Sequence, residues 1–301
     1  MTIRRPQPAF PIRLIALDLD GTIVGDDLIV PPRTKAAIRA ATARGVSVSI
    51  VTGRMATSAM VFARELGLTD PIVGFQGALI REVPPVEEAH LGRLLLHRPL
   101  AADAAREAIR WSRSIGLDPH VNHLERFIVR ADDPRAEDYS AFLGGRAILV
   151  DDLLEWLQKP VSKVIAVAES PIDEAVLHVA RARFAGQADV TLSHPRFLEF
   201  LRPGVSKGTA VRWLARRAKV PLGSVLAIGD QFNDLEMIAA VGHGAAMPHA
   251  PEAVRAAGRY VAPPLADAGV AEIIEQLVLA PDRQARAAAA RYEADALAAT
   301  A

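Results

Sequence analysis

The sequence of 301 residues contains no cysteine. This absence excludes disulfides, thiolate catalysis and cysteine metal sites. Basic and acidic residues number 35 each, so no overall field favours nucleic acid or an anionic membrane as a partner. The longest apolar runs have only strand length, and Met1 to Pro11 lacks the apolar segment of a signal peptide. We therefore expect a cytoplasmic protein without a membrane span.

Two polar residue types are scarce. The chain has only two asparagines, Asn122 and Asn233. Only five of its 35 basic residues are lysines: Lys35, Lys159, Lys163, Lys207 and Lys219. A lysine or asparagine inside a polar motif is therefore informative.

An acidic loop, Asp18-Leu-Asp20-Gly21-Thr22, follows the apolar run 12–17, which predicts a buried strand. In open α/β sheets, ligands bind at the carboxyl ends of the strands. A structural turn needs only one Asp and a Gly, whereas two neighbouring carboxylates repel each other. The loop therefore indicates a bound cation or a catalytic role.

Other loop types fit poorly. An EF-hand beginning at Asp18 would need Gly and Glu where Ile23 and Ile29 stand. No P-loop pattern occurs, and the segment from Gly242 to Met247 lacks the third glycine of a dinucleotide fingerprint.

Alternation of apolar strands and helices predicts an α/β fold with a Rossmann-like parallel sheet core. The expected strands are 12–17, 46–51, 72–75, 78–80, 225–228, 245–247 and 260–261. The expected helices are 32–45, 55–66, one from 206, 234–240, one from 251, 266–279 and a peripheral one over the last twenty residues.

The regular alternation of predicted strands and helices is interrupted between Pro84-Pro85 and Pro203-Gly204. This stretch predicts helices at 101–114 and 172–184, a turn-rich segment at 116–130, and strands at 147–150, 161–168 and 188–192. We therefore expect a core formed by 1–83 and 203–301, with 84–202 as an inserted α+β cap domain.

A second acidic loop, Gly229 to Asp234, follows the strand 225–228. If both strands belong to one parallel sheet, Asp18, Asp20, Asp230 and Asp234 converge at its carboxyl edge. Oxygen ligands of this kind favour Mg²⁺ over zinc. For Asp234 alone, a helix N-cap is an equally good interpretation.

Two further motifs suit a phosphate. Thr52-Gly53-Arg54 offers a hydroxyl, a glycine and free N–H groups before a helix, although an ordinary N-cap also explains it. Lys207 stands at the start of a helix, where a cation is unfavourable unless anions lie nearby, or it lies on a solvated face. Together the motifs fit phosphoryl transfer through an aspartyl-phosphate, which needs a nucleophilic carboxylate, a second acid and positive groups around phosphorus.

In order along the chain, these motifs resemble the haloacid dehalogenase superfamily of phosphohydrolases. The pattern is Asp-x-Asp-Gly-Thr, a strand-ending Thr, Lys in Ser-Lys-Gly, and Gly-Asp-x-x-Asn-Asp. The segment 198–208 and the run 229–237 look like the Cof-type subfamily, and 84–202 is similar to its C2-type cap.

The resemblance implies a role for each matching residue. Asp18 would be the nucleophile and Asp20 the general acid/base, while Thr52 and Lys207 would hold the phosphoryl group. The other implied phosphate- or substrate-binding residues are Gly53, Arg54, Gln76 and Asn233. Mg²⁺ would be bound by Asp18, the backbone carbonyl of Asp20, and Asp230, with Asn233 and Asp234 in support.

Two segments depart from the subfamily pattern. Gln76-Gly77 replaces the usual Asn-Gly, and Met247-Pro-His-Ala250 replaces Met-Gly-Asn-Ala. Both segments flank the expected site. The sequence therefore does not specify the substrate contacts made there, whereas the residues expected to carry the chemistry are all present.

Substrate selection is expected in the cap. A polar turn there could contact the substrate, but a solvent-facing loop is the simpler interpretation of its residues, His120, Asn122, His123 and Arg126. A metal site at the two histidines is not expected, because no third ligand is evident.

The leading hypothesis is a magnesium-dependent phosphatase acting on small phosphate monoesters, such as sugar phosphates or nucleotide-like cofactors. A phosphomutase of the same fold and a non-catalytic binding protein are the alternatives. The sequence specifies neither the substrate nor the oligomeric state.

Overall fold

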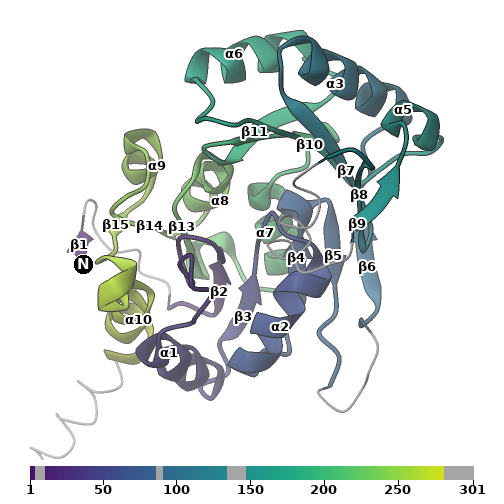
Figure 1. Cartoon of the computed structure of the whole chain (residues 1–301). Helices are drawn as coiled ribbons and strands as arrows, with labels where there is room; N and C mark the ends of the chain where they lie inside the picture. The colour runs from purple at the N-terminus through teal and green to yellow at the C-terminus, as the bar shows by residue number, and fades with distance from the viewer. Residues whose placement is uncertain (4–10, 86–90, 134–146, 281–301) are drawn as a thin grey trace, which may run out of the picture.

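The computed structural model describes residues 1–3, 11–85, 91–133 and 147–280 (Figure 1). The helix expected over the last twenty residues lies outside these ranges.

The core is built on a six-stranded sheet in the order β1-β15-β14-β13-β2-β3. All neighbours in it are parallel except β1, which pairs antiparallel with β15. The strands are β1 (Thr2–Ile3), β2 (Leu14–Leu17), β3 (Ser47–Ile50), β13 (Val225–Gly229), β14 (His243–Ala246) and β15 (Tyr260–Val261). β2, β3 and β13 are almost entirely buried, as expected for parallel strands covered on both faces.

Helices cover both faces of this sheet (Figure 1). One apolar cluster joins the sheet to α1 (Pro32–Thr42), α2 (Ala56–Leu66) and α10 (Gly269–Ile274), which continues into a wide turn, η5 (Glu275–Leu279). A second cluster joins the opposite face to α7 (Lys207–Arg217), α8 (Leu235–Ala240) and α9 (Glu252–Ala257). Single 3₁₀ turns are η1 (Phe75–Gly77), η2 (Leu222–Ser224), η3 (Phe232–Asp234) and η4 (Leu265–Asp267).

The strand order reverses at β2. From β2 the chain proceeds to β3 on one side, whereas β13, β14 and β15 follow on the other side. Such a switch point opens a crevice at the carboxyl ends of the strands, where ligands of α/β proteins bind. The loops after β2, β3 and β13 all lie at this edge.

The inserted segment contains a second six-stranded sheet in the order β11-β12-β10-β7-β8-β9. Its strands are β7 (Asp118–His123), β8 (Arg126–Arg130), β9 (Ala147–Val150), β10 (Lys163–Val167), β11 (Asp189–His194) and β12 (Phe197–Leu201). On one face, alternate residues such as Val164 and Phe200 pack with α3 (Ala102–Ser114), α5 (Leu153–Trp156) and α6 (Glu174–Arg183). The other face is turned toward the core domain (Figure 1).

A small antiparallel sheet is formed by residues that lie between β3 and β7 in the sequence. It comprises β4 (Ile72–Gly74), β5 (Leu79–Arg81) and β6 (Leu94–His97). A parallel bridge between Val51 and Val73 connects it with the end of β3.

The predicted α/β architecture with a parallel core sheet and an inserted mixed sheet is confirmed. The prediction of a turn-rich segment at 116–130 is wrong, because these residues form the hairpin β7–β8. Strands β1, β6 and β12 and the short helix α5 were not expected. In the described part of the chain, no helix combines the length and apolar character that a membrane span requires.

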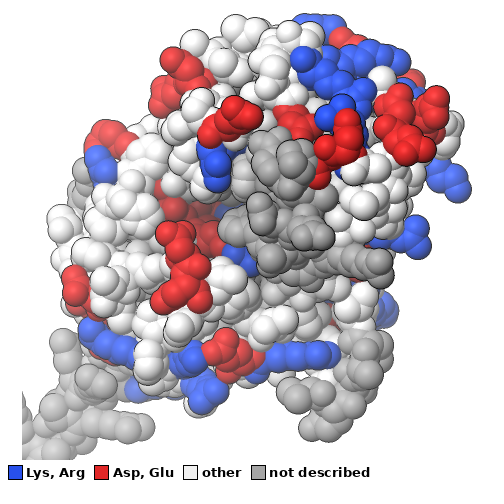
Figure 2. All heavy atoms as spheres, viewed as in Figure 1, with Lys and Arg blue, Asp and Glu red and all other residues white. Residues whose placement is uncertain are grey.

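Acidic and basic side chains are interspersed on the face shown in Figure 2. This mixed surface agrees with the balanced charge of the sequence.

Candidate active site

The loop after β2 carries two carboxylates in different surroundings. The side chain of Asp18 is 7% exposed, whereas that of Asp20 is 41% exposed. Gly21 has φ +75° and lies so close to Asp230 that an added Cβ would be 2.4 Å from its Oδ2. Glycine therefore allows the first acidic loop to approach the second.

Lys207 lies at the first position of α7. The helix begins with a capping box in which Ser206 Oγ accepts from the Thr209 N–H and Thr209 Oγ1 accepts from the Ser206 N–H, both at 3.0 Å. The Lys207 ammonium is buried and donates to Asp18 Oδ1 at 2.5 Å and to Asp234 Oδ1 at 2.6 Å. The alternative of a solvated lysine is therefore wrong. Burial alone would lower the pKa of Lys207, but the two carboxylates outweigh burial and raise it.

Three carboxylates, those of Asp18, Asp230 and Asp234, offer oxygens that all lie within 4.8 Å of one another. Burial is the main cause that raises the pKa of Asp18 well above its usual range, and Asp234 adds to it while Lys207 opposes it. Burial also raises the pKa of Asp234, against the effect of Lys207. Lys207 alone does not balance the three carboxylates, and a divalent cation would relieve the excess negative charge of the cluster.

The ligand set fits magnesium in its chemistry, since all the donors are oxygens. The three carboxylates differ in availability, however. Asp234 uses Oδ1 for Lys207 and Oδ2 for the N–H groups of Asp230 and Gln231 at 2.9 and 3.0 Å. This arrangement positions the loop and Lys207, so Asp18 and Asp230 are the better direct ligands.

Asp230 has neighbours of its own. Thr22 Oγ1 donates to its Oδ1 at 3.2 Å, and His249 Nε2 lies 3.1 Å from its Oδ2. The hydrogen bond with Asp230 raises the pKa of His249 above its ordinary value, against the effect of burial. His249 belongs to the segment 247–250, which differs from the subfamily pattern. This difference places an imidazole at the acidic cluster.

The loop after β3 turns polar groups toward the same edge. Thr52 is buried, and its Oγ1 accepts from the Arg54 N–H at 3.1 Å, which leaves the hydroxyl hydrogen free to donate. The Arg54 guanidinium binds Asp20 at two points, Nε to Oδ2 at 2.8 Å and Nη2 to Oδ1 at 2.5 Å. α2 begins only at Ala56, so Thr52 is not its N-cap.

The turn after β4 brings Gln76 to the site. The Gln76 side chain is buried and bonds Asn233 through its Oε1, with a distance of 3.0 Å to Asn233 Nδ2. An added Cβ on Gly53 would lie 2.3 Å from Gln76 Nε2. Glycine at position 53 thus makes room for the longer amide that replaces the usual asparagine.

The structure therefore brings together all the site residues predicted from the sequence. They are Asp18, Asp20, Thr52, Gly53, Arg54, Gln76, Lys207, Asp230, Asn233 and Asp234. Two charged residues of the cap were not predicted from the sequence: Lys163 reaches Gly53, and Glu199 reaches Gln76. A signal was present, because each is a charged residue in an otherwise apolar strand.

The expected polar turn of the cap is differently arranged. His120 and Asn122 are buried on β7, so a solvent-facing loop is wrong for both. The His120 Nε2 lies 2.9 Å from Asp133 Oδ2 and 3.5 Å from Asp118 Oδ2, a grouping that the sequence did not reveal. His123 is not part of this group of close potential ligands.

A cavity of about 550 Å³ lies between the cap and the core beside Lys207. The cap contributes Arg181, Asp189 and Thr191 to its wall, and the core contributes Gln76, Lys207 and Asn233. A pocket of this size suits a small metabolite.

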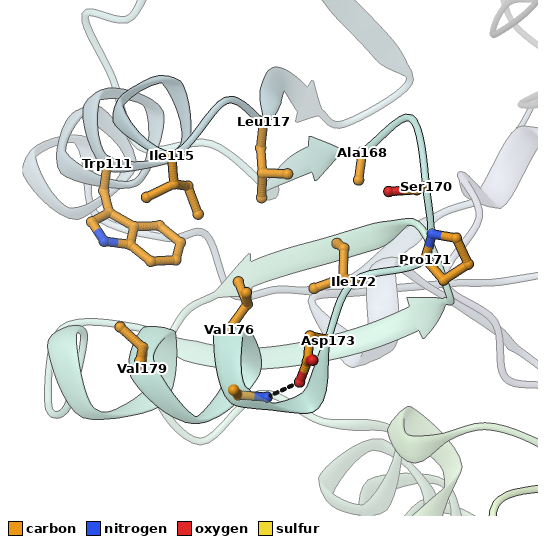
Figure 3. Close-up of a pocket in the computed structure, with 11 residues that line it drawn as sticks. Trp111, Ile115, Leu117, Ala168, Ser170, Pro171, Ile172, Asp173, Val176 and Val179 are labelled. Atoms are coloured by element: carbon orange, nitrogen blue, oxygen red, sulfur yellow. Dashed lines mark hydrogen bonds between the residues drawn. The ribbon is translucent and has the colours of Figure 1, made fainter.

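A second pocket, of about 380 Å³, lies between α3 and α6 on the outer side of the cap (Figure 3). Its wall is mainly apolar, with Trp111 and Ile172 among the lining residues, and its one carboxylate, Asp173, caps α6 by accepting from the Ala175 N–H at 2.7 Å. The acidic cluster lies on the other side of the cap sheet, so this pocket is not the active site.

Fold and site together define a class of α/β enzymes in which a cap domain faces a carboxylate cluster at the switch point of a parallel sheet. The chain belongs to the haloacid dehalogenase-like hydrolases, because the sequence profile of that family matches residues 15–274. Within this superfamily it is a phosphatase.

Two relatives illustrate the similarity. The HMP-PP phosphatase of Serratia proteamaculans is 30% identical over 240 residues, which cover 79% of this chain and 84% of the relative. The 5-amino-6-(5-phospho-D-ribitylamino)uracil phosphatase YitU of Bacillus subtilis is 26% identical over 278 residues, covering 87% and 96%.

Solved structures show the same fold. A haloacid dehalogenase-like hydrolase from Bacteroides thetaiotaomicron has a TM-score of 0.73 at 24% identity, covering 88% of this chain and 99% of that one. The subclass IIB sugar phosphatase BT4131 has a TM-score of 0.75 at 20% identity, covering 88% and 98%.

Proposed function

We propose that this chain is a magnesium-dependent phosphatase that hydrolyses small phosphate monoesters through an aspartyl-phosphate on Asp18. The observation that carries the proposal is the buried bridge from Lys207 to Asp18 and Asp234, beside Asp230. A lysine is held there by carboxylates at a crevice open to ligands, and this combination is what an anionic phosphoryl group in transfer requires.

The two carboxylates of the first loop differ in burial, and their proposed roles differ accordingly. Lys207 binds Oδ1 of Asp18, which leaves Oδ2 as the oxygen that attacks phosphorus. Asp20 is more exposed, so both water and a leaving group can reach it. It is therefore the acid that protonates the leaving oxygen and the base that then activates water to release phosphate.

Three groups would hold the phosphoryl oxygens. Lys207 supplies positive charge and Thr52 supplies a hydroxyl. The N–H of Gly53 completes the set, while the Arg54 guanidinium is engaged by Asp20. Asn233, held by Gln76, extends the site toward the rest of the substrate.

Magnesium would be held by Asp18, Asp230 and the backbone carbonyl of Asp20, with Asp234 positioning Lys207 and the loop. When bound, the ion offsets the repulsion between the anionic nucleophile and the anionic phosphate.

The cavity of about 550 Å³ beside Lys207 and Asn233 has the size of a small-ligand site, which supports a sugar phosphate or a nucleotide-like cofactor as the substrate. The two named relatives are named as phosphatases of small phosphorylated metabolites. We therefore propose a phosphorylated metabolite as the partner, with neither nucleic acid nor membrane involved.

A phosphomutase would use the same nucleophile but return the phosphoryl group to a bound sugar. Its product distinguishes it, since a mutase yields an isomeric ester with little inorganic phosphate. A non-catalytic binding protein is disfavoured, because a competent residue stands at every chemical position.

The test is phosphate release from a panel of sugar phosphates and phosphorylated cofactors, with magnesium and with a chelator. We expect magnesium-dependent release from a few members and none from Asp18→Asn with an unchanged circular dichroism spectrum. Isomerised ester without phosphate would support the mutase instead, and an active Asp18→Asn would refute the proposal.

A further inference from the structure

A buried carboxylate of the cap is bonded directly to the core. Glu199 on β12 is 2% exposed. Its Oε1 accepts from Lys163 Nζ at 2.7 Å and from Ser193 Oγ at 2.6 Å, and its Oε2 accepts from Gln76 Nε2 at 3.0 Å. The first two donors belong to the cap and the third to the core.

The two neighbours of Gln76 fix the orientation of its amide. A carboxylate only accepts, so Nε2 must face Glu199 and Oε1 must face Asn233. Gln76 thus links the cap sheet to the acidic loop. The residue has φ +58° and follows Phe75 at φ +50°, a conformation that side chains rarely adopt and that surrounding contacts must maintain.

Lys163 performs a second task. Besides Glu199, its Nζ donates to the carbonyl of Gly53 at 2.9 Å and lies 5.6 Å from the centre of the Phe75 ring. This lysine therefore contacts both the phosphate-binding loop 52–54 and the turn that carries Gln76.

The three backbone carbonyls of the loop 52–54 accept hydrogen bonds from both domains. The core binds the outer two, since Gln76 N–H donates to Thr52 O and Phe75 N–H donates to Arg54 O, both at 3.0 Å. The cap binds the middle one through Lys163.

The hydrogen bond to the Gly53 carbonyl fixes the orientation of the peptide plane between Gly53 and Arg54. Because a trans peptide sets its C=O and N–H in opposite directions, the bond from Lys163 turns the Arg54 N–H the other way. There the N–H meets Thr52 Oγ1 at 3.1 Å and orients the hydroxyl that is expected to bind phosphate.

We propose that Lys163 and Glu199 are positioning residues of the cap, which set the loop 52–54 in its phosphate-binding conformation when the cap lies against the core. Gln76 is the link through which the cap also reaches Asn233. This inference rests on the proposed phosphatase function. A buried ion pair is a poor source of stability compared with apolar residues of similar volume, so a specific geometric task better accounts for its presence.

The test compares Lys163→Met, Glu199→Gln and Gln76→Asn with the wild type. Gln76→Asn keeps the amide but is one methylene too short to bridge Glu199 and Asn233. Lys159→Met is the matched control, because Lys159 is an exposed lysine of the same cap. Each protein is assayed with magnesium on p-nitrophenyl phosphate and on one sugar phosphate, and its melting temperature is measured.

For Lys163→Met we expect kcat to fall by about ten- to a hundredfold on both substrates, the usual consequence of a misplaced catalytic group. KM should change much less, and Lys163→Arg should restore part of kcat, because a guanidinium can still donate to Glu199 and Gly53. Hydrogen exchange in a peptide covering 52–54 should become faster, as it should in Glu199→Gln, which conserves shape.

Two results separate the inference from the proposed function. If the wild type releases no phosphate from any substrate, the proposed function itself has failed. If the wild type is active and Lys163→Met and Glu199→Gln lower the melting temperature but keep the kcat of Lys159→Met, the pair only fastens the cap and the inference is wrong.

Discussion

Arg54 and Asp20 form a two-point ion pair across the mouth of the acidic cluster, with distances of 2.8 and 2.5 Å. The arginine side chain is 5% exposed and the aspartate 41% exposed. The proposed general acid/base is therefore held in one orientation by a residue from the neighbouring loop, while solvent still reaches it.

Replacing Arg54 by lysine should lower kcat more than it raises KM. Lysine keeps the charge but cannot hold a carboxylate at two points, so Asp20 would sample other orientations. We expect a loss of about tenfold in kcat for a sugar phosphate, a typical fraction of what a positioned acid/base supplies.

Arg33→Lys is the matched control for this change. Arg33 makes a similar two-point pair with Glu275 at 3.1 and 2.8 Å, but on the exposed surface of α1. Steady-state kinetics of the two variants decide the matter, and equal kcat values would contradict the role given to Arg54.

His249→Asn should make the enzyme easier to saturate with magnesium. The imidazole lies against Asp230 Oδ2 and competes there with a cation. Its side chain is 47% exposed, so removal should lower the half-saturating magnesium concentration by about two- to fivefold, equivalent to ~0.4–1 kcal/mol.

Activity is titrated with magnesium for the wild type, His249→Asn and His178→Asn, the last removing an exposed histidine of α6. A higher magnesium requirement in His249→Asn would mean that His249 orients Asp230 instead of competing for it.

The stability of the cap should depend on pH through His120. Burial would lower the pKa of this imidazole, but the hydrogen bonds to Asp118 and Asp133 prevail and raise it above its ordinary value near 6.5. Since the folded state favours the protonated form, the stabilisation is complete below the unfolded pKa and is lost as pH rises through the folded one.

Urea unfolding of the wild type and His120→Gln tests this dependence. The difference in free energy of unfolding between the two proteins should be larger at about pH 5.5 than at about pH 8.5. A difference that is constant or grows with pH would show that the charge of His120 does not stabilise the fold.

The sequence predicted the core and its catalytic edge because both depend on local signals. Asp18 and Asp230 follow buried apolar strands directly, and parallel strands necessarily bring such loops to one edge. The alternation of strands and helices was equally readable.

The cap was harder to predict, because its sheet has one face on an apolar layer and the other on the polar crevice. His120 and Asn122 are polar residues buried on a strand, so their polarity resembled that of a loop. The partners of Lys163 and Glu199 lie in distant parts of the chain, and no local periodicity indicates such pairings.

The most direct test of the proposed aspartyl-phosphate is to look for the phosphoryl group on Asp18. The wild type is mixed with a ³²P-labelled substrate found in the panel, quenched in acid within one turnover, and digested for peptide mapping. We expect acid-stable, hydroxylamine-sensitive label on the peptide containing Asp18, and none in Asp18→Asn. Full turnover without labelled protein, or label on a different residue, would contradict it.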